Sequence, residues 1–120
     1  MTKLFYVTVE NTVFTIYCKS SSTRNGFKHE AEIFNGGYHC SSGKAYYLNR
    51  TWESWIFQTA CLNAVQNELN RIYNDTKQSY KLANNVKRIT AKHKQAIDEI
   101  YNNVAGAWLD MKQQLSTKQF

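Results

Sequence analysis

Six positively charged side chains within eighteen residues form the strongest chemical signal in this sequence. The segment from residue 77 to residue 94 contains no Asp or Glu. The chain has 15 basic and 9 acidic residues, so outside this segment the two signs balance at nine each. The formal net charge of +6 therefore belongs to one short stretch, which favours a binding surface. The expected contact residues are Lys77, Lys81, Lys87, Arg88, Lys92 and Lys94.

Catalytic side chains in a recognisable pattern are missing from the sequence. Gly36-Gly37 and Gly43 lie between expected strands rather than before a helix, so no phosphate-binding loop is predicted. The three His residues have no Ser or Cys companion in a nucleophile motif, and the carboxylates are scattered. We therefore expect a non-enzymatic protein without a cofactor.

Cysteine and histidine residues raise one question about metal binding. Cys18, His29, His39 and Cys40 could meet across a sheet, and thiolate and imidazole ligands suit zinc. However, His39 and Cys40 are adjacent, and adjacent strand residues point to opposite faces. We expect no metal site, although the sequence leaves open how closely the four side chains approach. Three scattered cysteines without an export signal indicate reduced thiols.

The first fifty residues carry the alternating pattern of β-strands. Strands are expected at residues 4–9, 13–18, 28–34 and 45–50, separated by polar or glycine-containing turns. The simplest arrangement is a four-stranded antiparallel meander. Residues 51–120 read as two helices, so the chain is predicted to be one α+β domain, with a sheet part (1–50) and a helical part (51–120).

The first helix is expected to begin at Thr51 as N-cap and to end near residues 74–76. The second is expected to be long and amphipathic, with an apolar stripe from Leu82 to Leu115 at an average step of about 3.67 residues. This stripe includes Ile100, Val104 and His93, and His93 is expected to be a buried structural residue. At 1.5 Å per residue it would span about 51 Å, against about 34 Å for the first helix. It should therefore overhang, bend near residues 102–106, or bury its end against another chain. The residues at risk of exposure are Trp108, Met111 and Leu115, and a second copy of the chain is one candidate to cover them.

On such a helix, four of the six cations would form one row away from the apolar stripe. This alignment requires a helix that begins before Lys77, and a break at Asn84-Asn85 would remove it. The alternative is a merely solvated polar face, although solvated faces usually mix both signs of charge.

One segment resembles a known group of proteins. It comprises Arg24-Asn25-Gly26-Phe27-Lys28-His29 and, after a turn, Tyr47-Leu48-Asn49-Arg50-Thr51-Trp52-Glu53, extended by Phe57-Gln58-Thr59. These residues resemble small accessory proteins of bacteriophages and prophages, in which an Asn-Arg-Thr-Trp-Glu turn leads from a strand into an aromatic-rich helix. The same residues also suit a structural role, with Thr51 capping the helix and Trp52 filling the corner between sheet and helix.

The resemblance implies a viral or prophage protein that acts in the cytoplasm of a bacterial host. By association it implies an inhibitor of host defence, of which anti-CRISPR proteins are the best-known group. The expected partner is then an RNA-guided CRISPR nuclease, contacted through its protein surface or its nucleic acid. The alternative is a nucleic-acid-binding accessory protein that uses the basic segment on phosphates, with Tyr80 and Tyr101 available for stacking on bases. No stretch approaches the length of a membrane span, and the alternating N-terminus is unlike a signal peptide.

Overall fold

The computed structural model describes residues 2–47 and 55–118, in which four strands precede three helices. The strands are β1 (Thr2–Val9), β2 (Thr12–Ser22), β3 (Phe27–Asn35) and β4 (Tyr38–Tyr47). They pair in chain order as an antiparallel meander, which confirms the α+β class. The helices are α1 (Trp55–Ala83), α2 (Ala91–Val104) and α3 (Gly106–Thr117), one more than the sequence predicted. The proposed Thr51 cap and Trp52 corner lie outside the described residues.

Tight turns explain the strand boundaries. Glu10, between β1 and β2, has a φ of 55°, and Gly36, between β3 and β4, has a φ of 62°. A two-residue turn at Gly36-Gly37 starts the next strand at once. The fourth strand therefore begins at Tyr38, and the prediction that it starts at residue 45 is wrong. Cys40 is the extra residue of a bulge, because Ile33 pairs with Ser41 whereas Phe34 pairs with His39.

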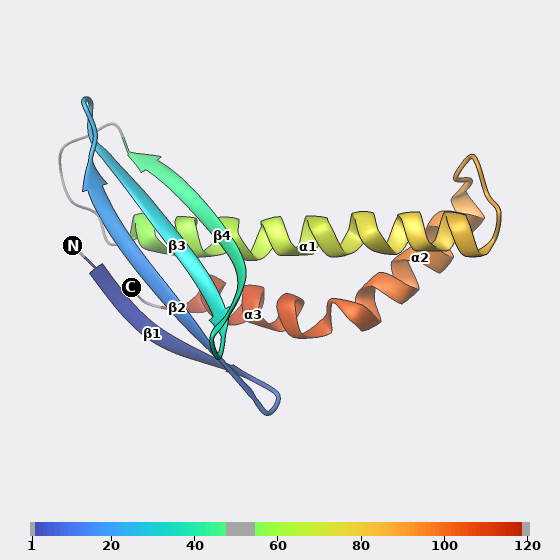
Figure 1. The fold of residues 1–120 in the computed structure, drawn as a ribbon, viewed down its shortest axis with the longest axis horizontal. Helices are drawn as coiled ribbons and strands as arrows, with labels where there is room; N and C mark the ends of the chain where they lie inside the picture. The colour runs from blue at the N-terminus through green and yellow to red at the C-terminus, as the bar shows by residue number, and fades with distance from the viewer. Residues whose placement is uncertain (1, 48–54, 119–120) are drawn as a thin grey trace.

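One face of the sheet carries the hydrophobic core. Figure 1 shows α1 and α3 on the same side of the four strands. Alternate strand residues point toward these helices, and α1 meets them with Phe57, Val65 and Leu69, while α3 contributes Met111 and Leu115. The buried strand residues at the centre are Val7, Val9, Ile16, Cys18, Ala31 and Ile33. The opposite face of the sheet is left without a covering helix in the described residues.

Close contact between α1 and β4 fixes how the helix lies on the sheet. A Cβ atom at Gly43 would lie 2.2 Å from the Ala64 amide nitrogen and 2.6 Å from the Ala60 carbonyl oxygen. Only glycine fits between these backbones. Beside it, the Asn63 and Asn67 side-chain amides donate hydrogen bonds to the Lys44 and Ser42 carbonyl oxygens, at 2.7 and 2.9 Å.

The long helix is α1, not the second helix as predicted. Its 29 residues pass through Asn74-Asp75-Thr76, where the sequence indicated a stop. Arg71 explains the continuation, because its guanidinium pairs with Glu68 one turn back and with Asp75 one turn ahead. After Ile72, α1 has no further buried residue among its described positions, so its last eleven residues extend beyond the core.

The expected long second helix is interrupted twice. The first break is at Asn84-Asn85, where Asn85 has a φ of 51°. The Val86 amide donates to the Lys81 carbonyl and the Asn85 amide donates to the Leu82 carbonyl, the paired bonds of a Schellman C-cap. The chain reverses there, and α2 runs back along α1 (Figure 1). We call residues 73–104 the helical arm and residues 77–94 the arm end.

The second break, at Ala105, confirms the expected bend near residues 102–106. It turns α3 back under the sheet, where Met111 and Leu115 are fully buried and the Trp108 ring packs on Phe14 at 5.5 Å between centroids. Of the three alternatives, an overhang that exposes Met111 and Leu115 is therefore excluded. The chain's own sheet covers these side chains, so they give no reason to expect a second copy there.

Gly43→Ala should destabilise the fold by about 1–3 kcal/mol or more, because the new methyl group would push the α1 backbone away from β4. Chemical denaturation measures the change. Gly37→Ala is the matched control, since nothing lies within 4 Å of its Cβ position. Equal stability of the two variants would contradict the close contact as described.

Candidate functional site

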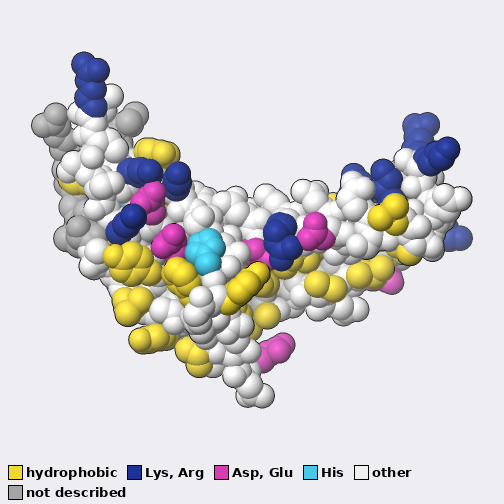
Figure 2. All heavy atoms as spheres, viewed as in Figure 1, with side chains coloured by type: hydrophobic (Ala, Val, Ile, Leu, Met, Phe, Trp, Pro, Cys, Tyr) yellow, Lys and Arg dark blue, Asp and Glu magenta, His cyan; other side chains and the backbone are white. Residues whose placement is uncertain are grey.

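The arm end brings the six predicted cations together, although not as the single helical row expected. Lys77 and Lys81 lie in the last turns of α1, Lys87 and Arg88 in the connecting turn, and Lys92 and Lys94 at the start of α2. The break at Asn84-Asn85 removes the predicted alignment. Chain reversal nevertheless gathers the residues at one extremity, and Figure 2 shows Lys and Arg side chains clustered there. The four that follow the break are exposed, and the two on α1 are half-buried.

Among the described residues, no acidic group neutralises this cluster. Within residues 2–47 and 55–118, no carboxylate oxygen lies within 4.0 Å of the six cations. The start of α2 also lacks an acidic residue in its first turn, and carries Lys92 and Lys94 instead. Helix N-termini ordinarily favour Asp or Glu, because the helix dipole is positive at that end. The local arrangement is thus unfavourable for helix stability and favourable for an approaching anion.

Polar contacts hold the start of α2 in place. Thr90 is the N-cap, and its backbone amide donates to His93 Nδ1 at 3.2 Å. The Thr90 hydroxyl lies 3.1 Å from the same nitrogen. His93, expected as a buried residue on a continuous stripe, is a half-buried capping residue whose ring packs 5.9 Å from Tyr80. These contacts fix the orientation of the first turn of α2, which presents two of the cations.

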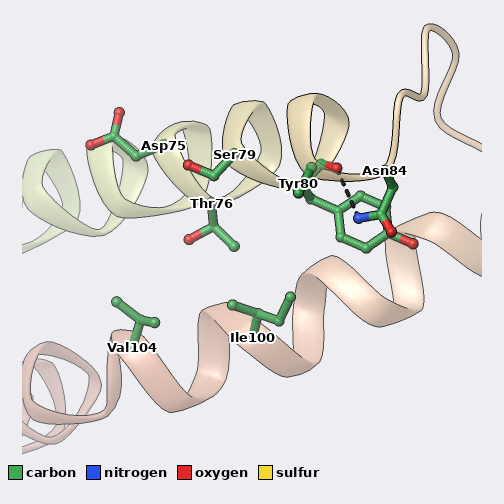
Figure 3. A pocket seen from close by; sticks show the side chains of 8 residues that line it. Asp75, Thr76, Ser79, Tyr80, Asn84, Ile100 and Val104 are labelled. Carbon is green, nitrogen blue, oxygen red and sulfur yellow. Dashed lines mark hydrogen bonds between the residues drawn. The ribbon is translucent and has the colours of Figure 1, made fainter.

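An apolar groove of about 410 Å³ lies beside the arm end, between α1 and α2. Figure 3 shows Ile100 and Val104 pointing from α2 toward α1, where Thr76 faces them. Ile100 is 43% exposed and Val104 is 60% exposed, so the groove is open to solvent. The sequence placed both residues on the apolar stripe of the second helix. The structure leaves them exposed because α1 and α2 form a two-helix projection with little to cover it.

The two aromatic residues proposed for base stacking both pack within the arm. Tyr101 meets Tyr73 edge to face, with ring centroids 5.3 Å apart, and Tyr80 contacts His93. Burial raises the pKa of the Tyr101 hydroxyl, and burial together with nearby Asp98 raises the pKa of the Tyr73 hydroxyl. Both groups are therefore neutral near pH 7. The Tyr73–Tyr101 and Tyr80–His93 contacts each join α1 to α2.

The residues considered for zinc do not form one cluster, because Cys18, His29 and His39 each contact a different residue. Cys18 Sγ lies 3.5 Å from Cys61 Sγ, and His29 Nδ1 lies 2.9 Å from the Ser20 hydroxyl. His39 belongs to the opposite, exposed face, where it is 3.9 Å from Glu32. In the described parts of the chain, no three His, Cys, Asp or Glu residues are grouped so that they could hold a metal ion.

The uncovered face of the sheet is a second exposed surface, with mixed character. It exposes apolar side chains including Leu4, Tyr6 and Val13. Charges of both signs lie next to them, and Glu30 pairs with Lys28 at 3.0 Å and with Lys19 at 3.4 Å (Figure 2). Because two of its cations, Lys19 and Lys28, are paired with Glu30, this face is a weaker candidate for an anionic partner than the arm end.

Searches of protein-family models, of curated proteins and of solved structures find no match to this chain. Among the described residues, no helix combines the length and the apolar character needed to cross a membrane. The geometry of the arm is therefore the main indication of function.

Ile97→Ala tests how the arm is held, because Ile97 is the buried residue of α2. Loss of this side chain should reduce the free energy of unfolding by about 2–5 kcal/mol. It should also speed hydrogen exchange of the α2 amides. Ile100→Ala on the same helix is the control, and should cost less than about 1 kcal/mol because its side chain is partly exposed. Similar losses for both would contradict the described packing of α2.

Proposed function

We propose that this protein is a non-catalytic binding protein that engages nucleic-acid phosphates through its arm end. The observation that carries the proposal is the acid-free cluster of six cations at the extremity of a projecting helical arm. Lys and Arg side chains that are free of internal ion pairs can neutralise phosphates, and the counterion release that follows supplies much of the affinity.

The shape of the arm supports the same proposal. The last eleven residues of α1 extend about 16 Å beyond the core at 1.5 Å per residue. A narrow projection with exposed cations can reach phosphates in a groove or channel that the sheet could not enter. The exposed positive start of α2 adds to the attraction for an anion.

Binding of the full-length protein to duplex DNA should weaken steeply with salt. If four cations engage phosphates, the log–log slope should be roughly −3.6, and Arg88→Glu with Lys92→Glu should reduce it to about −1.8. Fluorescence anisotropy across a salt series measures the slope.

Arg24→Glu with Lys44→Glu is the matched control for this experiment. It makes the same change in net charge at two exposed positions of the sheet part. The control should keep the steep slope. An equal loss in both double variants would show that net charge, not the arm end, governs binding.

The second candidate is a phage-encoded inhibitor of an RNA-guided CRISPR nuclease, acting in the cytoplasm of the bacterial host. Its sequence support is the resemblance carried by residues 24–29 and 47–59. The apolar groove beside the arm end favours it, because exposed apolar grooves receive side chains or helices of protein partners. A nuclease bound to its guide RNA offers phosphates and protein surface together.

Val104→Asp separates the two candidates, because it places a charge in the groove and leaves the six cations intact. An inhibitor should lose capture of the assembled nuclease–guide complex and its block of cleavage, while a plain DNA-binding protein should keep its affinity for free DNA. Val13→Asp is the control at similar exposure, 52% against 60%, on the uncovered sheet face. Cleavage assays and pull-down with the purified complex provide the readout. Full inhibition by the Val104 variant would exclude the groove as a contact.

A further inference from the structure

Two cysteines that are far apart in sequence meet in the core. Cys18 lies on the inward face of β2, and Cys61 lies on α1, 43 residues later. Their sulfur atoms are 3.5 Å apart, and both side chains are fully buried. Neither is near the arm end, so the pair has no part in the binding surface proposed above.

We propose that Cys18 and Cys61 are a site of reversible oxidative modification, at which a peroxide converts the two thiols into a disulfide that joins the sheet to α1. A disulfide has an S–S length of about 2.05 Å, so the sulfurs need to approach by about 1.5 Å. The cross-strand neighbour of Cys18 on β3 is Ala31, a small side chain. Rotation of the two cysteine side chains would supply this approach.

The environment makes the two thiols unequal. The hydrogen bond between the two sulfurs lowers the pKa of Cys18, burial partly opposes this effect, and nearby Lys3 adds a smaller lowering. The hydrogen bond to Cys18 and burial both raise the pKa of Cys61. Cys18 is consequently the sulfur that ionises first, and the thiolate is the form that reacts with peroxide.

The reaction balances with hydrogen peroxide as the oxidant. The Cys18 thiolate attacks one peroxide oxygen, the O–O bond breaks, and hydroxide leaves, which gives a sulfenic acid on Cys18. The Cys61 sulfur then attacks the Cys18 sulfur and displaces the hydroxyl group, which leaves as water with the Cys61 proton. Two thiols and one peroxide give one disulfide and two water molecules. Each sulfur loses one electron, and the peroxide oxygens gain both.

Cys40 provides an internal control. It is a partly buried thiol on β4 whose Sγ contacts the Tyr38 carbonyl oxygen at 3.7 Å, and no thiol lies within 4.0 Å of it in the described chain. Oxidation of the pair should leave Cys40 reduced, or modified separately from the other two. A closed loop that includes β3 and β4 should also stabilise the fold, since the disulfide restricts the unfolded chain.

The experiment treats the Cys40→Ala variant of the full chain with hydrogen peroxide and counts thiols by alkylation in denaturant. The expected result is no remaining thiol, an intact mass lower by two hydrogen atoms, and a peptide that joins Cys18 to Cys61. The thermal unfolding midpoint should rise by roughly 5–15 °C and return after dithiothreitol.

Two outcomes would overturn the proposal. One is that both thiols of the Cys40→Ala variant remain alkylatable after peroxide treatment. The other is that Cys18 gains oxygen atoms without forming a cross-link. Cys18→Ala and Cys61→Ala should each abolish the mass loss in an otherwise natural chain. Because the Cys40→Ala variant keeps both core thiols, the test remains decisive even if the two core variants fold poorly.

Discussion

The contact between α1 and β4 at Gly43 is the constraint on which the rest of the structure depends. The backbones of α1 and β4 lie so close there that no methyl group fits between them. This close approach determines which side chains meet in the core. The same contact sets the direction in which α1 leaves the sheet. Every residue of the arm, including the six cations at its end, takes its position from a helix anchored there. The binding surface is thus positioned by a feature of the fold that carries no charge.

Stability and binding place opposite demands on the arm. Its start on α1 is stabilised by Arg71, which pairs with Glu68 and Asp75. Beyond that point the chain accepts lysines at a helix N-terminus and apolar side chains in solvent, both of which reduce stability. A helical hairpin without a binding role would be expected to carry acidic residues at the helix N-terminus and polar residues at exposed positions. The unfavourable residues are concentrated in one projection, which is the pattern expected where a surface is kept for a partner.

The sequence predicted four strands in meander order, since strand periodicity and turn residues are local signals, but it missed the first seven residues of β4. Asn84-Asn85 and residues 102–106 were recognised as weak points of a helix. The helix boundaries were wrong because they depend on particular contacts, namely the ion pairs of Arg71 and the C-cap at Asn85. The exposure of Ile100 and Val104 could not be predicted, because a helical stripe looks the same whether or not a neighbour covers it. The meeting of Cys18 with Cys61 requires the register of α1 on β2, which no local pattern contains.

The amide side chains along β4 have a consequence for assembly. An edge strand ordinarily offers its backbone carbonyls to any extended peptide, and this is how β-augmentation and amyloid stacking begin. Here Asn63 and Asn67 occupy two such acceptors from the protein's own helix, and at the other edge the Gln114 amide does the same for the Thr8 carbonyl. A partner that tried to extend the sheet would first have to displace these side chains. Strand addition is therefore disfavoured at these three carbonyls.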